Sequence, residues 1–297
     1  MIDNINWYPG HMKKTRELIR ENMKMVDAVI EVIDARIPVS SRNPIIDELV
    51  SGKPRIIVMN KSDLADGEAS KAWAKSLEEN NLETHVLIMN SMSGEGTKDL
   101  FRILDKMAAK REGNAAMKPY RLMIVGVPNV GKSSLINRLT GHKSAKTGDR
   151  PGVTKGKQWL KLENGMQLLD TPGILWPKFE DPKAGVNLAF CGSIKDEILD
   201  VPTLGMELIG VLSERYPELL MKRYKLDELY EEGEESPETG YPMETAQDLA
   251  LGNMHRMALK RGCILPGKRI DYERIGRLVL DEFRSAKIGR ITLELPE

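Results

Sequence analysis

The sequence has few cysteines, no net charge and no long apolar run. Cysteine occurs only at Cys191 and Cys263, without metal-like spacing or a companion histidine cluster, which indicates a reducing compartment and no disulfide framework. No stretch approaches the roughly eighteen uninterrupted apolar residues of a membrane-spanning helix, and the start, MIDNINWYPGHMKK, lacks the apolar core of a signal peptide. We therefore expect a cytoplasmic protein that does not enter a membrane.

The net charge is zero because 44 Lys and Arg residues balance 44 Asp and Glu residues. This average says nothing about nucleic acid, but the charges are unevenly distributed. Residues 142–161 hold six basic residues against Asp149 alone, residues 261–290 hold eight against four acids, and acidic residues gather at 227–238. The two basic stretches favour contact with a polyanion, and the alternative is an ordinary solvated surface.

Apolar runs of strand length alternate with helix-like segments over the first part of the chain. Several runs are apolar nearly throughout, which is typical of parallel strands buried on both faces. The expected strands are 27–34, 55–60, 84–90, 120–126, 157–162 and 166–170, and the expected helices are 68–80, 97–111 and 132–140. The sequence thus predicts an α/β domain over residues 1–177, with a mostly parallel sheet and helices on both faces.

From residue 178 the pattern changes to helical periodicity, as in PTLGMELIGVLSERY and DYERIGRLVLDEFRSA. We see no good strand candidate in this part, although the terminal RITLELPE is a candidate for extended structure. Residues 231–242 have the composition of an exposed loop between helices. We therefore expect a small α-helical C-terminal domain over residues 178–297.

The stretch GVPNVGKSS, residues 126–134, has the GxxxxGK[ST] pattern of a phosphate-binding loop and lies between a predicted strand and a predicted helix. Glycines let backbone N–H groups surround phosphates, Lys132 would reach the β and γ oxygens, and Ser133 would ligate Mg²⁺. The alternative is a simple glycine turn. The predicted nucleotide contacts in this loop are Asn129, Val130, Gly131, Lys132, Ser133 and Ser134.

Two later motifs would sense the terminal phosphate. In LLDTPG, Asp170 would hold the Mg²⁺ shell through water, and the Gly173 N–H would meet the γ-phosphate. In GDRPGVTKG, Thr154 would close on Mg²⁺ in the triphosphate state. Each pattern is common by itself, and a lone DxxG is usually just a turn.

The motif NKSD has the pattern of a guanine-reading loop. The Asp63 carboxylate can accept hydrogen bonds from the ring N–H and the amino group of guanine, an arrangement that adenine does not offer. Asn60 and Lys61 would support the loop and cover the base. The alternative is an Asn/Asp turn with a helix cap. The motif NSMSG favours the guanine reading, because it ends the next predicted strand, where Asn90 and Ser91 would supply a second base-contacting loop.

These motifs occur in a cyclically shifted order. Ordinary GTPases begin with the phosphate loop and end with the guanine-reading loops, whereas here the guanine-reading loops come first. The carboxyl ends of parallel strands meet at one edge of a sheet, so the same site forms if residues 111–119 join the former termini. The sequence therefore predicts a circularly permuted P-loop GTPase domain that binds GTP or GDP with Mg²⁺. The switch after Asp170 runs straight into the C-terminal domain, so movement at the γ-phosphate is expected to reach that domain.

Together the motifs resemble a known family, the YlqF-type circularly permuted GTPases, ribosome biogenesis GTPase A. The resemblance covers nearly the whole chain and includes WYPGHM, DARIPVSSRNP, NKSD, GVPNVGKSS, PGVT, DTPGI and the late DYERIGRLVLDEFRSAKIGRITLELP. It implies a GTPase that joins a late precursor of the large ribosomal subunit and is stimulated by it. On this basis we expect contact with ribosomal RNA through the basic regions, release after hydrolysis, and a monomer.

Hydrolysis needs a group that orients water, and Ile174 stands where many small GTPases carry glutamine. Intrinsic hydrolysis is therefore expected to be slow without a partner or a monovalent cation. The candidate catalytic residue is His11, because its imidazole could orient the attacking water and the resemblance implies a catalytic histidine there. The alternative is a structural histidine beside Trp7 and Tyr8. Asn129 resembles the K⁺-coordinating asparagine of potassium-stimulated GTPases, and otherwise is an exposed loop amide.

Other readings stay open. The chain can be a non-ribosomal signalling switch whose helical domain binds a protein partner, or a nucleotide-binding structural module with negligible turnover. In DARIPVSSRNP, Arg36 and Arg42 are candidate phosphate or RNA ligands, or members of a local ion network with Asp34.

Overall fold

The computed structural model of the protein describes residues 17, 19–50, 52–79, 84–113, 118–141, 159–169 and 181–296. Contacts between residues divide the chain into two units. The first unit extends to Leu188 and takes in the end of the chain from Glu294, and the second runs from Ala189 to Leu293. Every predicted nucleotide-binding residue that the structure describes belongs to the first unit.

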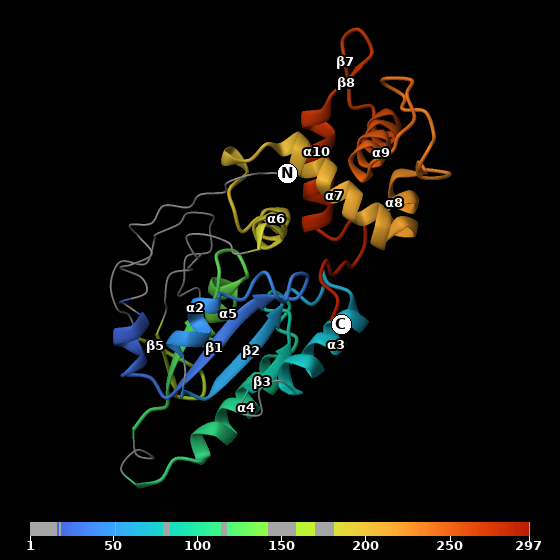
Figure 1. The fold of residues 1–297 in the computed structure, drawn as a ribbon. Coiled ribbons are helices and arrows are strands. Elements are labelled where there is room, and N and C mark those ends of the chain that lie inside the picture. The colour runs from blue at the N-terminus through green and yellow to red at the C-terminus, as the bar shows by residue number, and fades with distance from the viewer. Residues whose placement is uncertain are drawn as a thin grey trace. The chain divides into compact units, whose positions relative to one another are not determined.

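A six-stranded sheet forms the centre of the first unit (Figure 1). The strands lie in the order β3-β2-β1-β4-β6-β5, and every neighbouring pair is parallel except β5 with β6. Each strand lies within a segment predicted from the sequence, so the mostly parallel sheet is confirmed. The strands are β1 (Ala28–Asp34), β2 (Arg55–Asn60), β3 (Thr84–Ile88), β4 (Arg121–Val125), β5 (Trp159–Lys161) and β6 (Gln167–Leu169).

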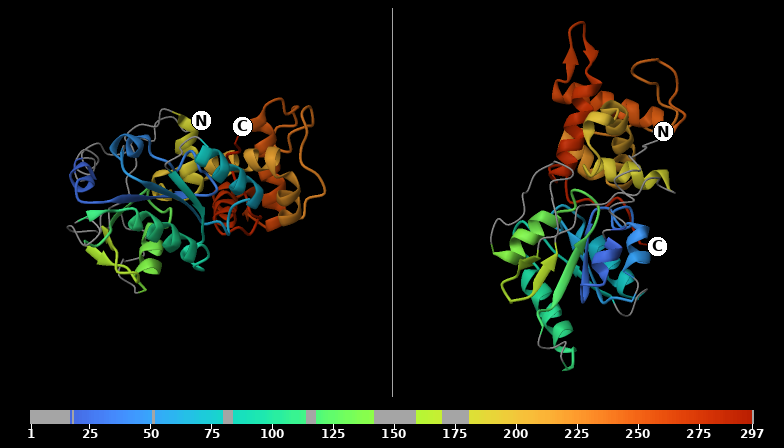
Figure 2. Two further views of the ribbon diagram at one scale, coloured as in Figure 1. Left: turned by 90° about the horizontal axis from the view of Figure 1, so that it is seen from below. Right: turned by 90° about the vertical axis from the view of Figure 1, so that its left-hand side faces the viewer.

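Helices cover both faces of this sheet (Figure 2). On one face, α2 (Pro44–Leu49) and α3 (Gly67–Glu79) pack on the odd-numbered side chains of β1, and Trp73 of α3 joins the cluster around Ile33 and Ile57. The other face is covered by α4 (Thr97–Ala109) and α5 (Lys132–Thr140), which bury Leu104 and Leu135.

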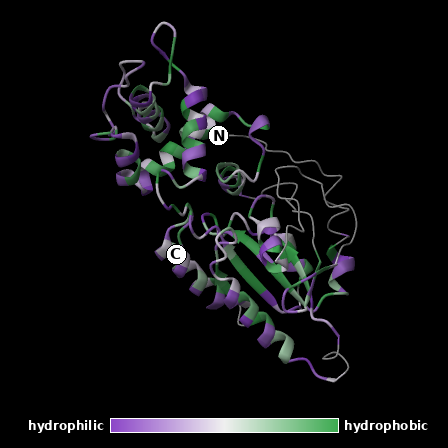
Figure 3. Cartoon of the chain, turned by 180° about the vertical axis from the view of Figure 1, so that it is seen from behind, coloured by the Kyte–Doolittle hydropathy of each residue, from purple (hydrophilic) through white to green (hydrophobic). Residues whose placement is uncertain are grey.

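Burial on both faces explains the apolar runs in the sequence. Every residue of β1 and β2 is buried, and Figure 3 shows the central strands as hydrophobic nearly throughout, whereas the helices also carry hydrophilic residues. The predicted helices 68–80, 97–111 and 132–140 are confirmed as α3, α4 and α5. Helix α2 was not predicted from the sequence, because its six residues are too few to show a helical period.

The second unit is helical, as predicted for the C-terminal part. Helix α6 (Pro182–Phe190) leads into it, and a 3-10 turn, η2 (Asp196–Ile198), precedes the main helices. These are α7 (Val201–Arg215), α8 (Pro217–Tyr224), α9 (Ala246–Arg261) and α10 (Tyr272–Arg284). Local sequence sets their starts: the Thr245 and Asp248 side chains form a reciprocal capping box at α9. Residues 231–242, between α8 and α9, are exposed apart from the half-buried Ser236, as predicted for an exposed loop.

The expectation of a C-terminal part without strands is wrong. Two short strands, β7 (Ile264–Leu265) and β8 (Arg269–Ile270), form an antiparallel hairpin before α10. Strands of two residues are too short for alternation to appear in the sequence. The terminal segment 290–296 forms no strand. The predicted boundary between residues 177 and 178 lies outside the described residues and stays a prediction, whereas the two units divide inside α6.

The end of the chain returns to the first unit through Glu294. The Glu294 carboxylate accepts hydrogen bonds from the backbone N–H of Val39 (2.6 Å), the N–H of Ser40 (3.0 Å) and Nδ2 of Asn187 (3.1 Å), and it also bonds the Ser40 hydroxyl. The backbone oxygen of Glu294 accepts from Nε1 of Trp73 at 2.7 Å. One residue near the C-terminus therefore contacts the loop after β1 and α6 through its side chain, and α3 through its backbone oxygen.

Within the second unit, α7 and α10 cross at two glycines. A Cβ atom added to Gly205 would lie 2.5 Å from Cα of Gly276, and one added to Gly276 would lie 2.8 Å from the backbone oxygen of Val201. Backbone atoms cannot move aside without shifting a whole helix. The close crossing therefore requires glycine at both positions.

We expect Gly205→Ala to destabilise the protein by about 1–3 kcal/mol, because the added methyl group overpacks the crossing of α7 and α10. The matched control is Gly210→Ala in the same helix, where a Cβ would make an ordinary 3.4 Å contact with Ala250. The control is expected to be neutral or stabilising by up to about 1 kcal/mol, since alanine favours helix. Urea unfolding measures both, and equal stability of the two variants would contradict the close crossing.

Candidate nucleotide-binding site

Three predicted loops gather at the carboxyl edge of the sheet. NKSD follows β2, NSMSG follows β3, and the phosphate loop follows β4 (Figure 1). The strand register places the ends of the strands side by side, because Asp34 of β1 pairs with Asn60 of β2, and Met59 of β2 pairs with Ile88 of β3. The sheet therefore assembles motifs that are far apart in the chain.

The phosphate loop turns sharply away from β4 at Gly126, whose φ is 149°. A Cβ at this position would lie 2.3 Å from the backbone oxygen of Val32 in β1, so only glycine fits. Nζ of Lys132 donates to the backbone oxygens of Gly126 (3.0 Å) and Val127 (2.6 Å). The lysine thus lies across the loop, where a phosphate-binding lysine is needed.

Helix α5 begins where the phosphate loop ends. Gly131, with φ of 98°, precedes its first residue, and the partly exposed Ser133 and Ser134 occupy its first turn. Asn129 is exposed and has a left-handed φ of 61°. The first N–H groups of a helix lack intrahelical acceptors and attract anions, so this end of α5 suits phosphate oxygens.

The buried side chain of Asn60 connects all three loops. Its Nδ2 donates to the backbone oxygen of Val130 at 2.7 Å, and its Oδ1 accepts from the N–H (3.0 Å) and the hydroxyl (2.8 Å) of Ser91. A Cβ at Gly131 would lie 2.2 Å from Nδ2 of Asn60, so this glycine makes room for the bridge. The predicted supporting role of Asn60 thus has a definite geometry.

The other guanine-loop residues differ in what their side chains do. Asp63 is exposed, so its carboxylate can be reached by a base. Lys61 has a left-handed φ of 61°, and its ammonium lies 2.9 Å from Asp34. Asn90 is buried, and its Oδ1 accepts from the N–H groups of Met92 (2.9 Å) and Ser93 (3.2 Å). Asn90 therefore shapes the second base-contacting loop from within.

Arg138 on α5 is a supporting residue that the sequence motifs do not indicate. Its Nη2 donates to the backbone oxygen of Met92 at 2.5 Å, and its Nε lies 3.5 Å from that of Ser91. A Cβ at Gly94 would lie 3.1 Å from the same guanidinium. Helix α5, which begins at the phosphate loop, thereby also holds the second base-contacting loop. An arginine on a helix surface carries no sequence signal for this role.

The predicted ion pair with Asp34 is found for Arg36, whereas Arg42 pairs with other carboxylates. Arg36 forms a bidentate pair with Asp34, and both side chains are 1% exposed. Arg42 pairs with Asp47 at 2.9 Å and lies 3.5 Å from Glu31.

The remaining predicted site residues lie outside the described residues. These are His11, Thr154, Asp170 and Gly173, together with Ile174. Their roles stay predictions. In the part of the chain that the structure describes, no three His, Cys, Asp or Glu side chains gather as metal ligands, and no helix is long and apolar enough to cross a membrane.

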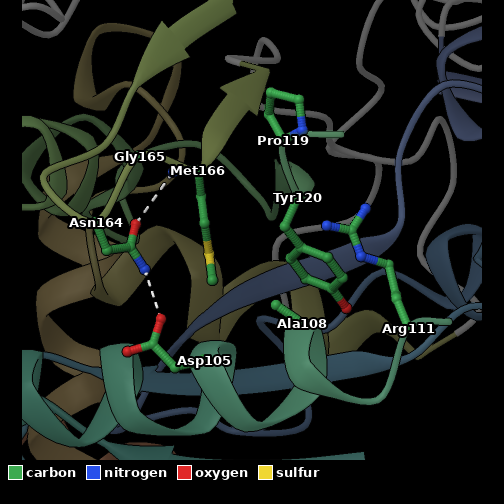
Figure 4. A pocket seen from close by; sticks show the side chains of 8 residues that line it. All are labelled: Asp105, Ala108, Arg111, Pro119, Tyr120, Asn164, Gly165 and Met166. Carbon is green, nitrogen blue, oxygen red and sulfur yellow. Dashed lines mark hydrogen bonds between the residues drawn. The ribbon is translucent and has the colours of Figure 1, made fainter. Parts of the chain in front are cut away.

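A hollow of about 310 Å³ lies near the start of β4, away from the phosphate loop at its other end (Figure 4). Nδ2 of Asn164 donates a hydrogen bond to Oδ1 of Asp105 there (3.0 Å), and the Arg111 guanidinium lies over the Tyr120 ring, 4.8 Å from its centroid. Arg111 also donates to the backbone oxygen of Lys118 at 2.7 Å. The hollow is therefore lined by α4, by the turn between β5 and β6, and by the segment that joins α4 to β4, where the permuted order requires a connection.

Comparisons with known proteins give one consistent result. A family described as "50S ribosome-binding GTPase" matches residues 121–222. Ribosome biogenesis GTPase A of Bacillus cereus is 43% identical over 302 residues, which cover 99% of this chain and 94% of that protein. Mitochondrial ribosome-associated GTPase 1 of Mus musculus is 40% identical over 222 residues, which cover 71% and 68% respectively. The crystal structure of GNP-bound YlqF from Thermotoga maritima is 28% identical, with a TM-score of 0.63, and the match covers 96% of this chain and 99% of that chain.

We expect Asn60→Ala to weaken GDP binding by a factor of roughly 10–100, because it removes three hydrogen bonds that hold the loops together. Titration with a fluorescent GDP analogue measures this affinity. Asn164→Ala is the matched control, since this exposed amide lies by the hollow and not among the nucleotide loops, and we expect unchanged affinity. An Asn60→Ala variant that binds GDP as tightly as the wild type would contradict the bridging role.

Proposed function

The chain belongs to the ribosome biogenesis GTPase A family, and on that premise we propose that it hydrolyses GTP while bound to a precursor of the large ribosomal subunit. In this proposal the GTP-bound chain promotes late maturation of the subunit, and hydrolysis triggers its release. It acts as a monomer in the cytoplasm. The names of the relatives support a ribosomal partner, and the loops at the sheet edge support a guanine nucleotide as ligand.

The observation that carries the nucleotide proposal is the Asn60 bridge. It joins the loop that carries the exposed Asp63 to the phosphate loop, and on this basis one ligand would contact both that carboxylate and the start of α5. A guanine base offers two donors to that carboxylate, and the phosphates of the same molecule would meet Lys132 and the N–H groups of α5. Glycine at positions 126 and 131 supports this proposal, because it lets the phosphate loop lie close against Val32 of β1 and against Asn60.

Magnesium would be held by Ser133 in the first turn of α5 and by Thr154, with Asp170 acting through water. When bound, Mg²⁺ neutralises the charge that develops on the phosphate oxygens. The N–H of Gly173 would contact the γ-phosphate, and loss of that phosphate would release the segment that leads to α6. Asn129 would coordinate K⁺ through its side-chain oxygen, adding positive charge beside the phosphates.

Contact with ribosomal RNA would involve the basic surface of the second unit. Exposed basic side chains occur on the β7-β8 hairpin, on α9 and α10 and after α10, namely Lys260, Lys268, Arg269, Arg274, Arg277, Lys287 and Arg290. Phosphate contacts of this kind make binding depend steeply on salt, because each neutralised phosphate releases counterions. The sequence stretch 142–161 would add further positive charge.

We expect the chain to cosediment with large ribosomal subunits in the presence of a non-hydrolysable GTP analogue, and to do so less as salt rises. The double variant Lys268→Glu/Arg269→Glu is expected to bind more weakly and to lower the slope of log affinity against log salt by about 1 per lost phosphate contact. Lys71→Glu/Lys75→Glu, on the exposed side of α3, is the control. Absence of nucleotide-dependent cosedimentation would favour a non-ribosomal switch.

His11→Ala tests the proposed catalytic residue. We expect GTP affinity to stay within a few-fold of the wild type while subunit-stimulated turnover falls by about 10²–10⁴, the usual contribution of a positioned proton-transfer group. His85→Ala on the exposed side of β3 is the matched control and is expected to retain stimulated turnover. Phosphate release is measured with and without large subunits, in K⁺ and in Na⁺. Unchanged stimulated turnover in His11→Ala would remove this histidine from the mechanism.

A further inference from the structure

Asp34 is a buried carboxylate at the end of β1, outside the motifs that read the nucleotide. Its Oδ1 accepts hydrogen bonds from the backbone N–H (3.1 Å) and Nε (2.9 Å) of Arg36. Its Oδ2 accepts from Nη2 of Arg36 (2.7 Å) and from Nζ of Lys61 (2.9 Å). The side chains of Asp34 and Arg36 are each 1% exposed. One carboxylate is thus shared by an arginine of its own loop and a lysine of the guanine-reading loop.

Lys61 needs support in the conformation that it adopts. Its φ of 61° lies in the left-handed region, which costs a non-glycine residue about 1 kcal/mol or more. The backbone on either side is held, because the N–H of Ala35 donates to the oxygen of Asn60 (2.9 Å) and the N–H of Leu64 donates to that of Lys61 (2.9 Å). The ion pair with Asp34 holds the side chain as well.

The Asp34 carboxyl group is held in its ionised form by its neighbours. Burial by itself would raise the pKa of this carboxyl group, but the neighbouring charges of Arg36 and Lys61 outweigh burial and hold its pKa well below the usual range. The anchor for the lysine is therefore ionised at physiological pH. In the low-dielectric interior, a hydrogen bond between two charged groups is stronger than a neutral one.

We propose that Asp34 is a positioning residue for guanine recognition, which acts by fixing Lys61 and with it the backbone that presents Asn60 and Asp63. The inference rests on the proposed function, since it assumes that the chain binds guanine nucleotides. A loop ordered in advance gives tighter binding because the ligand does not have to order it. The Lys61 side chain is 22% exposed, so part of it can be reached by a base while its ammonium is paired with Asp34.

The test is the GDP affinity of Asp34→Asn, measured by titration with a fluorescent GDP analogue. We expect binding to weaken by roughly 10–100-fold, the usual effect of losing a charge-assisted hydrogen bond. In a Lys61→Met background the same substitution is expected to cause no further loss, because Asp34 acts through the lysine. Additive losses of affinity in this mutant cycle would overturn the inference.

Two further variants separate positioning from folding. Glu31→Gln is the matched control: Glu31 also lies on β1, is 1% exposed and pairs with Arg55 (3.2 Å) and Arg42 (3.5 Å), and we expect its GDP affinity to stay within about twofold of the wild type. Asp34→Asn/Arg36→Gln removes both charges of the buried pair, so no arginine is left unpaired if the single variant fails to fold. We expect this double variant to bind GDP as weakly as Asp34→Asn.

The outcomes distinguish the inference from the proposed function. Failure of the wild-type chain to bind GDP would overturn the proposed function and the inference together. Wild-type affinity in a folded Asp34→Asn or Asp34→Asn/Arg36→Gln variant, beside a wild-type chain that binds, would overturn the inference alone. An equal loss of affinity in Glu31→Gln would also overturn it, because any buried carboxylate of β1 would then serve.

Discussion

The nucleotide loops depend on one side-chain amide, that of Asn60. Its three hydrogen bonds reach Val130, 70 residues away, and Ser91, 31 residues away. Since the amide is buried, each polar atom needs a partner, and the partners are the backbones and hydroxyl of the neighbouring loops. The strand ends bring these loops together whichever comes first in the chain. This is the physical reason why the permuted order preserves the site.

The loop after β1 connects the guanine-reading loop with the end of the chain. Asp34 at its start holds Lys61, and the Ser41 hydroxyl accepts from the backbone N–H of Asp34 at 3.0 Å. Ser40, which precedes Ser41, donates its backbone N–H to the Glu294 carboxylate, and its hydroxyl accepts from Nδ2 of Asn187 at 3.1 Å. The chain leaves the first unit in α6 and re-enters it at Glu294. Both points contact the loop after β1, and Asp34 at the start of this loop supports the guanine-reading loop through Lys61.

Much of the fold was predictable because its signals are local. Strands buried on both faces are apolar nearly throughout, and the GxxxxGK[ST] motif identifies a loop between strand and helix without reference to the rest of the chain. The features that escaped prediction are short or depend on distant partners. Helix α2 and the β7-β8 hairpin are too brief to show a period, and Arg138 gains its role only from the approach of the loop at Ser91 and Met92.

The sequence by itself determined the strands of the sheet, the helical character of the C-terminal part, and the shifted order of motifs that places this chain in its family. Only the tertiary structure decided which partners the polar side chains take. Arg36 was equally suited to a phosphate or to Asp34, and nothing in the sequence indicated that the Asn90 side chain accepts from the backbone of its own loop. Periodicity and motif spacing record local preferences, whereas a buried charge or amide is paired by whatever group the fold brings within reach.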